Sequence, residues 1–103
     1  MQKNFAIPEI VTQGREEQST NGSSLSLREF ADQLSAPLSI VGQSVSYEAA
    51  RNWENGEYEP NDGFLKVLYF LAPPESWQAQ FAIDCWRAKH GYEIWEQEPK
   101  DLL

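Results

Sequence analysis

Few residues of this chain are of a type that carries out chemistry, and their spacing does not bring them together. His90 is the only histidine and Cys85 the only cysteine, five positions apart on an expected helix. Side chains at that spacing do not share a helix face. A zinc site would need more ligands, and no glycine-rich phosphate loop is present. We therefore expect no enzyme activity, no catalytic residue, no metal site and no cofactor.

A second group of polar side chains, within residues 45–60, is suited to contact with a partner. Ala49, Ala50 and Trp53 form one apolar stripe of a short helix. Ser46 can cap its start, and Gly56 can end it as a left-handed residue. The side chains off the stripe are Tyr47, Glu48, Arg51 and Asn52. They form either a contact surface or an ordinary solvated helix face.

Together with the helix expected before it, this stretch resembles the Cro/C1-type (XRE family) of helix-turn-helix transcriptional regulators. The first matching piece is L-S-L-R-E-F-A-D-Q-L at residues 25–34. The second is 45–56, whose final W-E-N-G, with Pro60 after it, matches the end of the family's recognition helix. The resemblance covers about residues 7–72.

The resemblance implies an all-α fold, a five-helix lambda-repressor-like bundle that contains the helix-turn-helix. The chain would then be one domain, residues 1–103, with a motif core at 7–72. Residues 73–103 would add a C-terminal aromatic helix and a tail.

The resemblance also implies a sequence-specific regulator or repressor of transcription that binds double-stranded DNA. Carried onto this sequence, its DNA-binding residues are Arg28, Ser46, Tyr47, Glu48, Arg51 and Asn52. Arg51 would contact guanine, Asn52 adenine, and Glu48 the N4 amine of cytosine. Ser46 and Arg28 would position the DNA backbone.

A structural ion pair is implied as well, between Arg15 on the first expected helix and Glu54 at the end of the recognition helix. The alternative is that both residues are ordinary solvated charges, since exposed pairs often contribute little stability.

The connection between the two helices departs from the family. A helix-turn-helix normally has a turn of about three or four residues, whereas residues 35–44, S-A-P-L-S-I-V-G-Q-S, intervene here. The motif is therefore expected to have an extended turn. The insertion at 36–44 is either a tolerated surface loop or a wing or partner contact beside the DNA-facing surface.

The charge of the chain opposes DNA binding. Sixteen acidic residues against eight basic ones give a net charge of −8, whereas DNA-binding proteins usually present a basic face. Two hypotheses follow. The first is the DNA-binding regulator, for which we expect weak and strongly salt-dependent binding. The second is a protein-interaction module that keeps a helix-turn-helix shape without contacting DNA.

Periodicity and stop signals predict the remaining helices. One begins at Pro8 and ends near residue 18, and another begins after Ser26, with Glu29 completing a capping box. Residues 63–71 are apolar on nearly every side and follow a cap at Asn61 or Asp62, so this helix should be buried or covered by a partner. The residues expected in the core are Phe30, Leu34, Trp53, Leu65 and Leu68.

The last expected helix starts at Pro74 and runs to about residue 90. This segment carries more apolar area than one small core should need, which predicts a homodimer. The predicted dimer interface consists of Trp77, Phe81, Trp86, Ile94 and Trp95. The alternative is that these side chains cover the apolar helix 63–71 of the same chain.

Composition sets the remaining expectations. A single cysteine excludes an internal disulfide and favours a reducing compartment. No signal peptide or membrane-spanning run is evident. We expect a cytoplasmic protein with no membrane partner.

Overall fold

The computed structural model describes residues 7–17 and 25–96, and its regular structure is entirely helical. Five α-helices occur in this part of the chain: α1 Ile7–Glu17, α2 Leu27–Ser35, α3 Tyr47–Asn55, α4 Asp62–Leu71 and α5 Trp77–His90. Two 3-10 helices are added, η1 Ala36–Val41 and η2 Ile94–Glu96. The expected all-α fold is confirmed. The tail expected at the C-terminus lies, from residue 97 onward, outside the described residues.

Most helix starts follow from capping side chains. Ser26 and Glu29 form the expected capping box, in which each side chain accepts a hydrogen bond from the backbone N–H of the other residue. Of the two candidates at the start of α4, Asn61 is the cap.

The start of α5 differs from the prediction. Ser76 caps this helix by accepting from the N–H of Ala79 at 3.2 Å, so α5 begins at Trp77 and not at Pro74. The hydroxyl provides an acceptor for an unpaired first-turn N–H, and this stabilises the later start.

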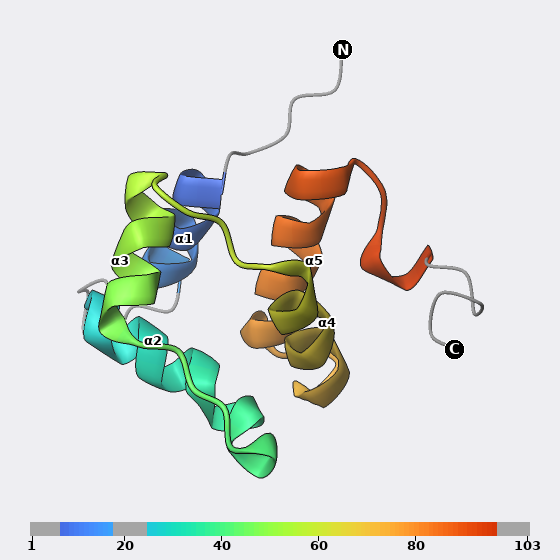
Figure 1. Ribbon diagram of the computed structural model, residues 1–103, viewed down its shortest axis with the longest axis horizontal. Helices are drawn as coiled ribbons and strands as arrows, with labels where there is room; N and C mark the ends of the chain where they lie inside the picture. The colour runs from blue at the N-terminus through green and yellow to red at the C-terminus, as the bar shows by residue number, and fades with distance from the viewer. Residues whose placement is uncertain (1–6, 18–24, 97–103) are drawn as a thin grey trace.

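The helices form two groups that enclose the core. In Figure 1, α1, α2 and α3 lie on one side, and α4 and α5 pack together on the other. Helix α1 contacts both α3 and α5 and so joins the groups. The predicted core residues are all buried: Phe30, Leu34, Trp53, Leu65 and Leu68.

A chain of aromatic rings crosses this core. Phe30 of α2 lies 5.3 Å from Trp77 and 5.5 Å from Phe81, both on α5. Trp53 of α3 lies 6.0 Å from Phe81 and 5.3 Å from Phe64 on α4. The rings meet at tilted or edge-on angles, the arrangements that aromatic pairs favour. These ring contacts pack α2, α3, α4 and α5 against one another in the core.

Most residues of the predicted dimer interface are not on the surface, so this prediction is wrong for them. Phe81, Trp86 and Ile94 are buried within the chain, exposed by only 3%, 2% and 2%. Trp77 is partly buried against the core, and only Trp95 is largely exposed, at 55%. Trp77 and Phe81 lie against Phe30 of α2, and Phe81 also lies against Trp53 of α3. The alternative, that these side chains cover the helix 63–71, agrees with the contacts of Trp86 with Lys66 and of Trp95 with Tyr69.

Helix α4 is only partly buried by its own chain. Leu65 and Leu68 are fully buried, but Phe70 at the far end is 87% exposed. Helix α5 covers one side of α4 only, so an apolar sequence on every side leaves part of its surface in solvent.

Candidate functional site

Helix α3 has capped ends, one buried face and one exposed face. The Ser46 Oγ accepts from the N–H of Ala49 at 3.0 Å, and Gly56 ends the helix with φ of 80°. Ala50 and Trp53 fix the inner face, since they are exposed by 0% and 8%. The opposite face of α3 is consequently turned outward.

The predicted contact residues lie largely on this outer face. Ser46, Tyr47, Glu48 and Arg51 are exposed, whereas Asn52 is partly buried and lies at the margin of the surface. We call the exposed residues, together with Arg28, the α3 face. Its residues offer hydrogen-bond donors and acceptors at neighbouring positions along one helix.

Arg28 joins this surface from α2. Its guanidinium carbon lies 5.0 Å above the ring of Tyr47, a cation–π contact. The contact brings the start of α2 against the start of α3, even though a long insertion separates the two helices in sequence. The structure thus places Arg28 beside Tyr47 of α3.

An anchor on the other side fixes α3 against α1. Arg15 Nη1 and Glu54 Oε2 are 2.5 Å apart, so the expected ion pair is present. Arg15 Nε also donates to the carbonyl of Leu25 at 2.8 Å. The hydroxyl of Thr12 donates to the same Glu54 oxygen at 2.9 Å. Sequence reasoning missed Thr12, although its position one turn before Arg15 on α1 was a usable signal.

The insertion between α2 and α3 is a folded element. Pro37 lies in the first turn of η1, Gly42 ends it with φ of 72°, and Leu38 is fully buried. The Ser35 Oγ accepts from the N–H of Val45 at 2.7 Å and donates to the carbonyl of Ala31 at 2.8 Å. These bonds join both ends of the connector, so the extended turn is a folded element and not an open loop.

Some of the described basic residues form ion pairs with carboxylates, and others do not. Within residues 7–17 and 25–96, Arg15, Arg87 and Lys89 each bind a carboxylate. Neither Arg51 nor Arg28 forms an ion pair with a described residue, and the Arg28 guanidinium lies over the Tyr47 ring. Two cations without a carboxylate partner in the described chain therefore share the α3 face.

Acidic side chains stand beside those cations. Glu48 belongs to the α3 face itself, and Glu57 and Glu59 follow α3 in an exposed segment. None of the three forms an ion pair with another described residue. The surface around α3 is thus mixed in sign, with an acidic excess after Gly56.

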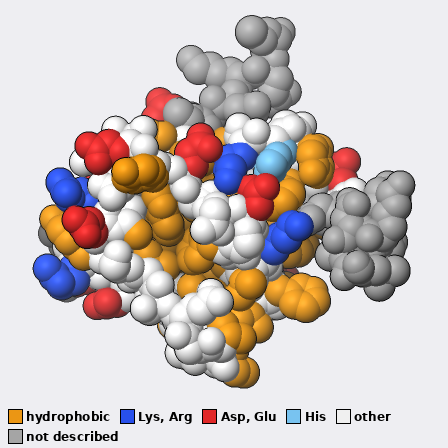
Figure 2. Space-filling model, in the orientation of Figure 1, with side chains coloured by type: hydrophobic (Ala, Val, Ile, Leu, Met, Phe, Trp, Pro, Cys, Tyr) orange, Lys and Arg blue, Asp and Glu red, His pale blue; other side chains and the backbone are white. Residues whose placement is uncertain are grey.

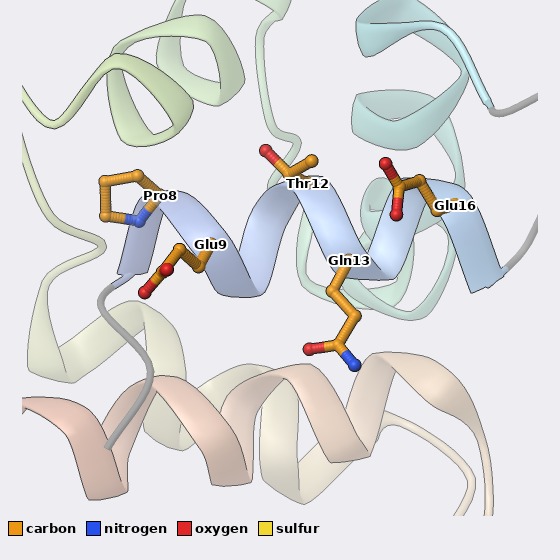
Figure 3. Close-up of a pocket in the computed structure, with 5 residues that line it drawn as sticks. All are labelled: Pro8, Glu9, Thr12, Gln13 and Glu16. Atoms are coloured by element: carbon orange, nitrogen blue, oxygen red, sulfur yellow. The ribbon is translucent and has the colours of Figure 1, made fainter. Parts of the chain in front are cut away.

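Two grooves formed by described residues lie near α3 or on α1. One, of about 410 Å³, lies on α1 and is lined by Pro8, Glu9, Thr12, Gln13 and Glu16 (Figure 3). The other, of about 330 Å³, lies between the starts of α3 and α4 and includes Ser46, Trp53 and Glu59. The residues that line the α1 groove include two carboxylates but no histidine, cysteine, lysine or arginine. The second groove lies beside the α3 face.

Cys85 is buried in the core, and His90 contacts an aspartate of a neighbouring helix. Cys85 is fully buried, and this burial raises the pKa of its thiol strongly, so the reactive thiolate is disfavoured. His90 Nε2 lies 3.0 Å from Asp62 Oδ1, and Lys89 Nζ lies 2.8 Å from the same oxygen. No group of three or more His, Cys, Asp or Glu side chains in the described ranges is arranged to hold a metal ion.

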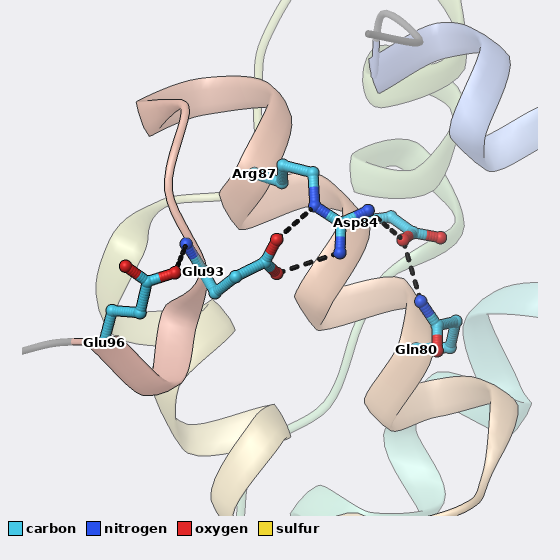
Figure 4. A network of polar contacts seen from close by, with 5 residues as sticks. All are labelled: Gln80, Asp84, Arg87, Glu93 and Glu96. Carbon is cyan, nitrogen blue, oxygen red and sulfur yellow. Dashed lines mark hydrogen bonds and ion pairs between the residues drawn. The ribbon is translucent and has the colours of Figure 1, made fainter.

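A polar network at the other end of the molecule fixes η2 (Figure 4). Arg87 donates two hydrogen bonds to Glu93, at 2.7 and 2.9 Å, and these bonds raise the pKa of the guanidinium. Asp84 binds Gln80 at 2.8 Å, but burial raises the pKa of its carboxyl. The network holds the turn after α5 in place and so supports the burial of Ile94.

Comparison with protein-family models, curated proteins and solved structures found no match. Among the described residues, no helix combines the length and apolar character needed to cross a membrane. The function must therefore be argued from the α3 face itself.

Proposed function

We propose that this protein is a sequence-specific DNA-binding transcriptional regulator of the helix-turn-helix type. One observation carries the proposal: α3 is anchored on its inner face, and its solvent-exposed outer face carries side chains of the types that can contact base edges. Glu48 and Arg51 are exposed on it, and Arg28 is held beside it by its contact with Tyr47. A helix that enters the major groove needs such an exposed, rigidly supported face.

The chemistry of the face is compatible with base contacts. An exposed arginine such as Arg51 can donate two hydrogen bonds to the O6 and N7 atoms of guanine, and Glu48 can accept from the N4 amine of cytosine. Asn52 is partly buried, so it would contribute less to base contacts than the family resemblance implied.

The flanking residues suit the DNA backbone. The Ser46 hydroxyl accepts within the cap and retains its own proton, which it can donate to a phosphate. Arg28 retains its charge for the same purpose, because its contact is with a ring and not with a carboxylate. Both residues would position the helix without selecting a sequence.

The ion pair with Arg15 supports the proposal indirectly. Glu54 is a carboxylate on the reading helix, and its negative charge would oppose phosphates if it were free. Its contacts with Arg15 and Thr12 neutralise it and turn it towards α1. The resemblance to the XRE family, given by the W-E-N-G stretch and Pro60, agrees with this arrangement.

A second candidate function is a protein-interaction module that does not contact DNA. The acidic excess after α3 favours it, because Glu57 and Glu59 are exposed and have no ion-pair partner in the described chain. Such a surface suits a basic protein segment. DNA binding remains our proposal because two of the three described cations without a carboxylate partner, Arg28 and Arg51, belong to the α3 face.

The proposal is tested by selecting bound duplexes from a pool with a randomised segment, using the wild-type protein and Arg51→Ala. If Arg51 contacts guanine, the variant loses about 1–3 kcal/mol of discrimination at one base position. Lys66→Ala is the matched control, since Lys66 of α4 lies over the Trp86 ring of α5 and is not part of the α3 face. Identical sequence preferences for wild type and Arg51→Ala would remove Arg51 from the reading residues. Failure to enrich any sequence with the wild type would contradict the proposal.

A further inference from the structure

The groove between the starts of α3 and α4, which we call the α3–α4 groove, combines aromatic and polar lining residues. Trp53 of α3 and Phe64 of α4 both line it, and their ring centroids are 5.3 Å apart at an angle of 47°. Val45 and Pro60 add apolar surface. In Figure 2, hydrophobic side chains show at the centre of the view, between the positions that α3 and α4 take in Figure 1. The volume of about 330 Å³ lies at the lower end of the range of ligand pockets.

The charge of this groove favours a cation. Glu59 carries the only charge among the described residues that line it. Glu59 is exposed and forms no ion pair with another described residue. The groove also lies at two helix starts, but there Ser46 and Asn61 already accept hydrogen bonds from first-turn N–H groups. An anion would therefore meet a carboxylate and no basic side chain, whereas a cation would meet an unpaired carboxylate and two aromatic rings.

We propose that the α3–α4 groove binds an arginine side chain in a basic segment of a partner protein. The planar guanidinium can donate two parallel hydrogen bonds to the Glu59 carboxylate. It also stacks on aromatic faces, so Trp53 and Phe64 would contribute cation–π contacts. Lysine carries a more compact and more strongly hydrated charge, and it cannot stack in this way. The groove should therefore prefer arginine to lysine.

The surroundings of the groove favour a segment with several basic residues over a small free cation. Glu57 is exposed two residues before Glu59, and it too has no ion-pair partner in the described chain. Asp62 is already bound by Lys89 and His90. A segment with two arginines can pair with both Glu57 and Glu59, whereas a small cation in the groove pairs with Glu59 alone. The net charge of −8 also attracts a basic partner at longer range.

The position of the groove gives the partner an effect on DNA binding, and this step alone rests on the proposed function. Ser46 lines the groove and also belongs to the α3 face. A segment bound in the groove would thus lie at the start of α3, where Ser46 is proposed to contact the DNA backbone. The segment and DNA should compete for this end of the helix, so the partner would inhibit DNA binding.

The test is a titration of the intact protein, without DNA, with the labelled peptide Gly-Arg-Gly-Arg-Gly, followed by fluorescence anisotropy at about 50 mM salt. For so small a contact we expect a Kd on the order of 10–1,000 µM. Glu59→Gln removes the charge but keeps the shape of the side chain, and it should weaken binding by about fivefold or more. Circular dichroism should show an unchanged fold, because Glu59 is exposed.

Glu75→Gln is the matched control. Glu75 is exposed between α4 and α5 and forms no ion pair with a described residue, so this variant loses the same charge outside the groove. Its Kd should change by less than about twofold. The peptide with lysine in place of arginine should bind more weakly, and the peptide with glutamine most weakly. In NMR spectra, arginine peptide should shift the Trp53 indole N–H and the Phe64 amide most.

Four outcomes would overturn the proposal. They are an absence of saturable binding, equal weakening in Glu59→Gln and Glu75→Gln, NMR shifts that avoid Trp53 and Phe64, and binding of methylguanidinium as tight as that of the peptide. The last outcome would assign the groove to a small cation instead of a protein segment. Because the titration contains no DNA, each outcome is independent of whether the α3 face binds DNA.

Discussion

Single side chains decide how α3 is held, and the contact of Arg15 with Glu54 is the clearest case. The two side chains are only 24% and 19% exposed, and Arg15 also binds the carbonyl of Leu25. Hydrogen bonds between charged, partly buried groups contribute more than those of exposed pairs. This contact joins the end of α3 to α1 and the segment before α2.

Replacement of Arg15 by alanine should therefore lower the free energy of unfolding by about 1–3 kcal/mol, because Glu54 keeps its charge but loses its main partner. Urea denaturation followed by circular dichroism measures this change. Arg51→Ala, which removes the same side chain from an exposed position without an ion pair, should stay within about 0.5 kcal/mol of wild type. Equal losses in the two variants would show that the ion pair does not anchor α3.

At the scale of elements, the ends of the helices depend on backbone conformation. Gly56 closes α3 with φ of 80°, in the left-handed region that other residues adopt at a penalty. Gly63 lies in the first turn of α4 and has no positive φ, and a Cβ there would meet only the Asn61 side chain at 3.5 Å.

These two glycines should respond to alanine in opposite directions. Gly56→Ala should lower the free energy of unfolding by about 1 kcal/mol, whereas Gly63→Ala should raise it by about 0.4–1 kcal/mol, because alanine restricts the unfolded chain. Thermal unfolding of both variants provides the comparison. Stabilisation by Gly56→Ala would show that the left-handed end of α3 is not needed.

Much of the element structure was predictable from local chemistry. The boundaries of α2 and α3 follow from Ser26, Ser46 and Gly56, and the core positions of Phe30 and Trp53 follow from helical periodicity. The Arg15 contact followed from a family resemblance and could not have come from periodicity, since it joins residues 39 positions apart.

Other features could not be predicted, because they depend on tertiary packing. Apolar composition alone does not distinguish a core side chain from an interface side chain. Trp86 and Phe81 were therefore assigned to a dimer interface, although both are buried in the core. Helix α5 is covered by neighbours on several sides, which a count of apolar residues does not show. The insertion was likewise ambiguous until the packing of Leu38 defined η1.

At the scale of the whole molecule, α4 and α5 are joined at one end by Asp62. Its carboxylate accepts from Lys89 at 2.8 Å and contacts His90 at 3.0 Å. The hydrogen bond from Lys89 is the largest cause of a lowered pKa at Asp62, with a smaller contribution from His90. The folded state therefore favours the ionised carboxylate.

The pH dependence follows from this direction. The stabilisation from Asp62 is fully present above its ordinary pKa of 3.8 and is lost as the pH falls through the lower folded-state value. The unfolding free energy of Asp62→Asn should thus decline less steeply than that of wild type below that pH, in denaturant titrations at several pH values. Burial raises the pKa of Asp84, so protonation of Asp84 favours the folded state as the pH falls from the raised value towards the ordinary 3.8. Asp84→Asn lacks this gain, and its unfolding free energy should therefore decline more steeply than that of wild type in that window above 3.8. Parallel pH profiles for all three proteins would contradict the assignment.

The distribution of charge over the whole chain raises the central question of DNA binding. Only Arg28 and Arg51 are available on the α3 face, within a molecule of net charge −8. Few phosphates can be neutralised by one copy, and the logarithm of the affinity falls with the logarithm of salt concentration in proportion to that number. Binding should accordingly be weak for a single copy and sensitive to salt.

The most direct measurement is the binding of wild-type protein to mixed genomic DNA fragments over a series of salt concentrations, with sequencing of the retained fragments. We predict retention at low salt, a progressive loss as salt rises, and enrichment of a shared sequence among the fragments that remain longest. Equal retention of all fragments would indicate contact with the DNA backbone alone. No retention even at about 20 mM salt, where charge interactions are screened least, would contradict the proposal that the α3 face binds DNA.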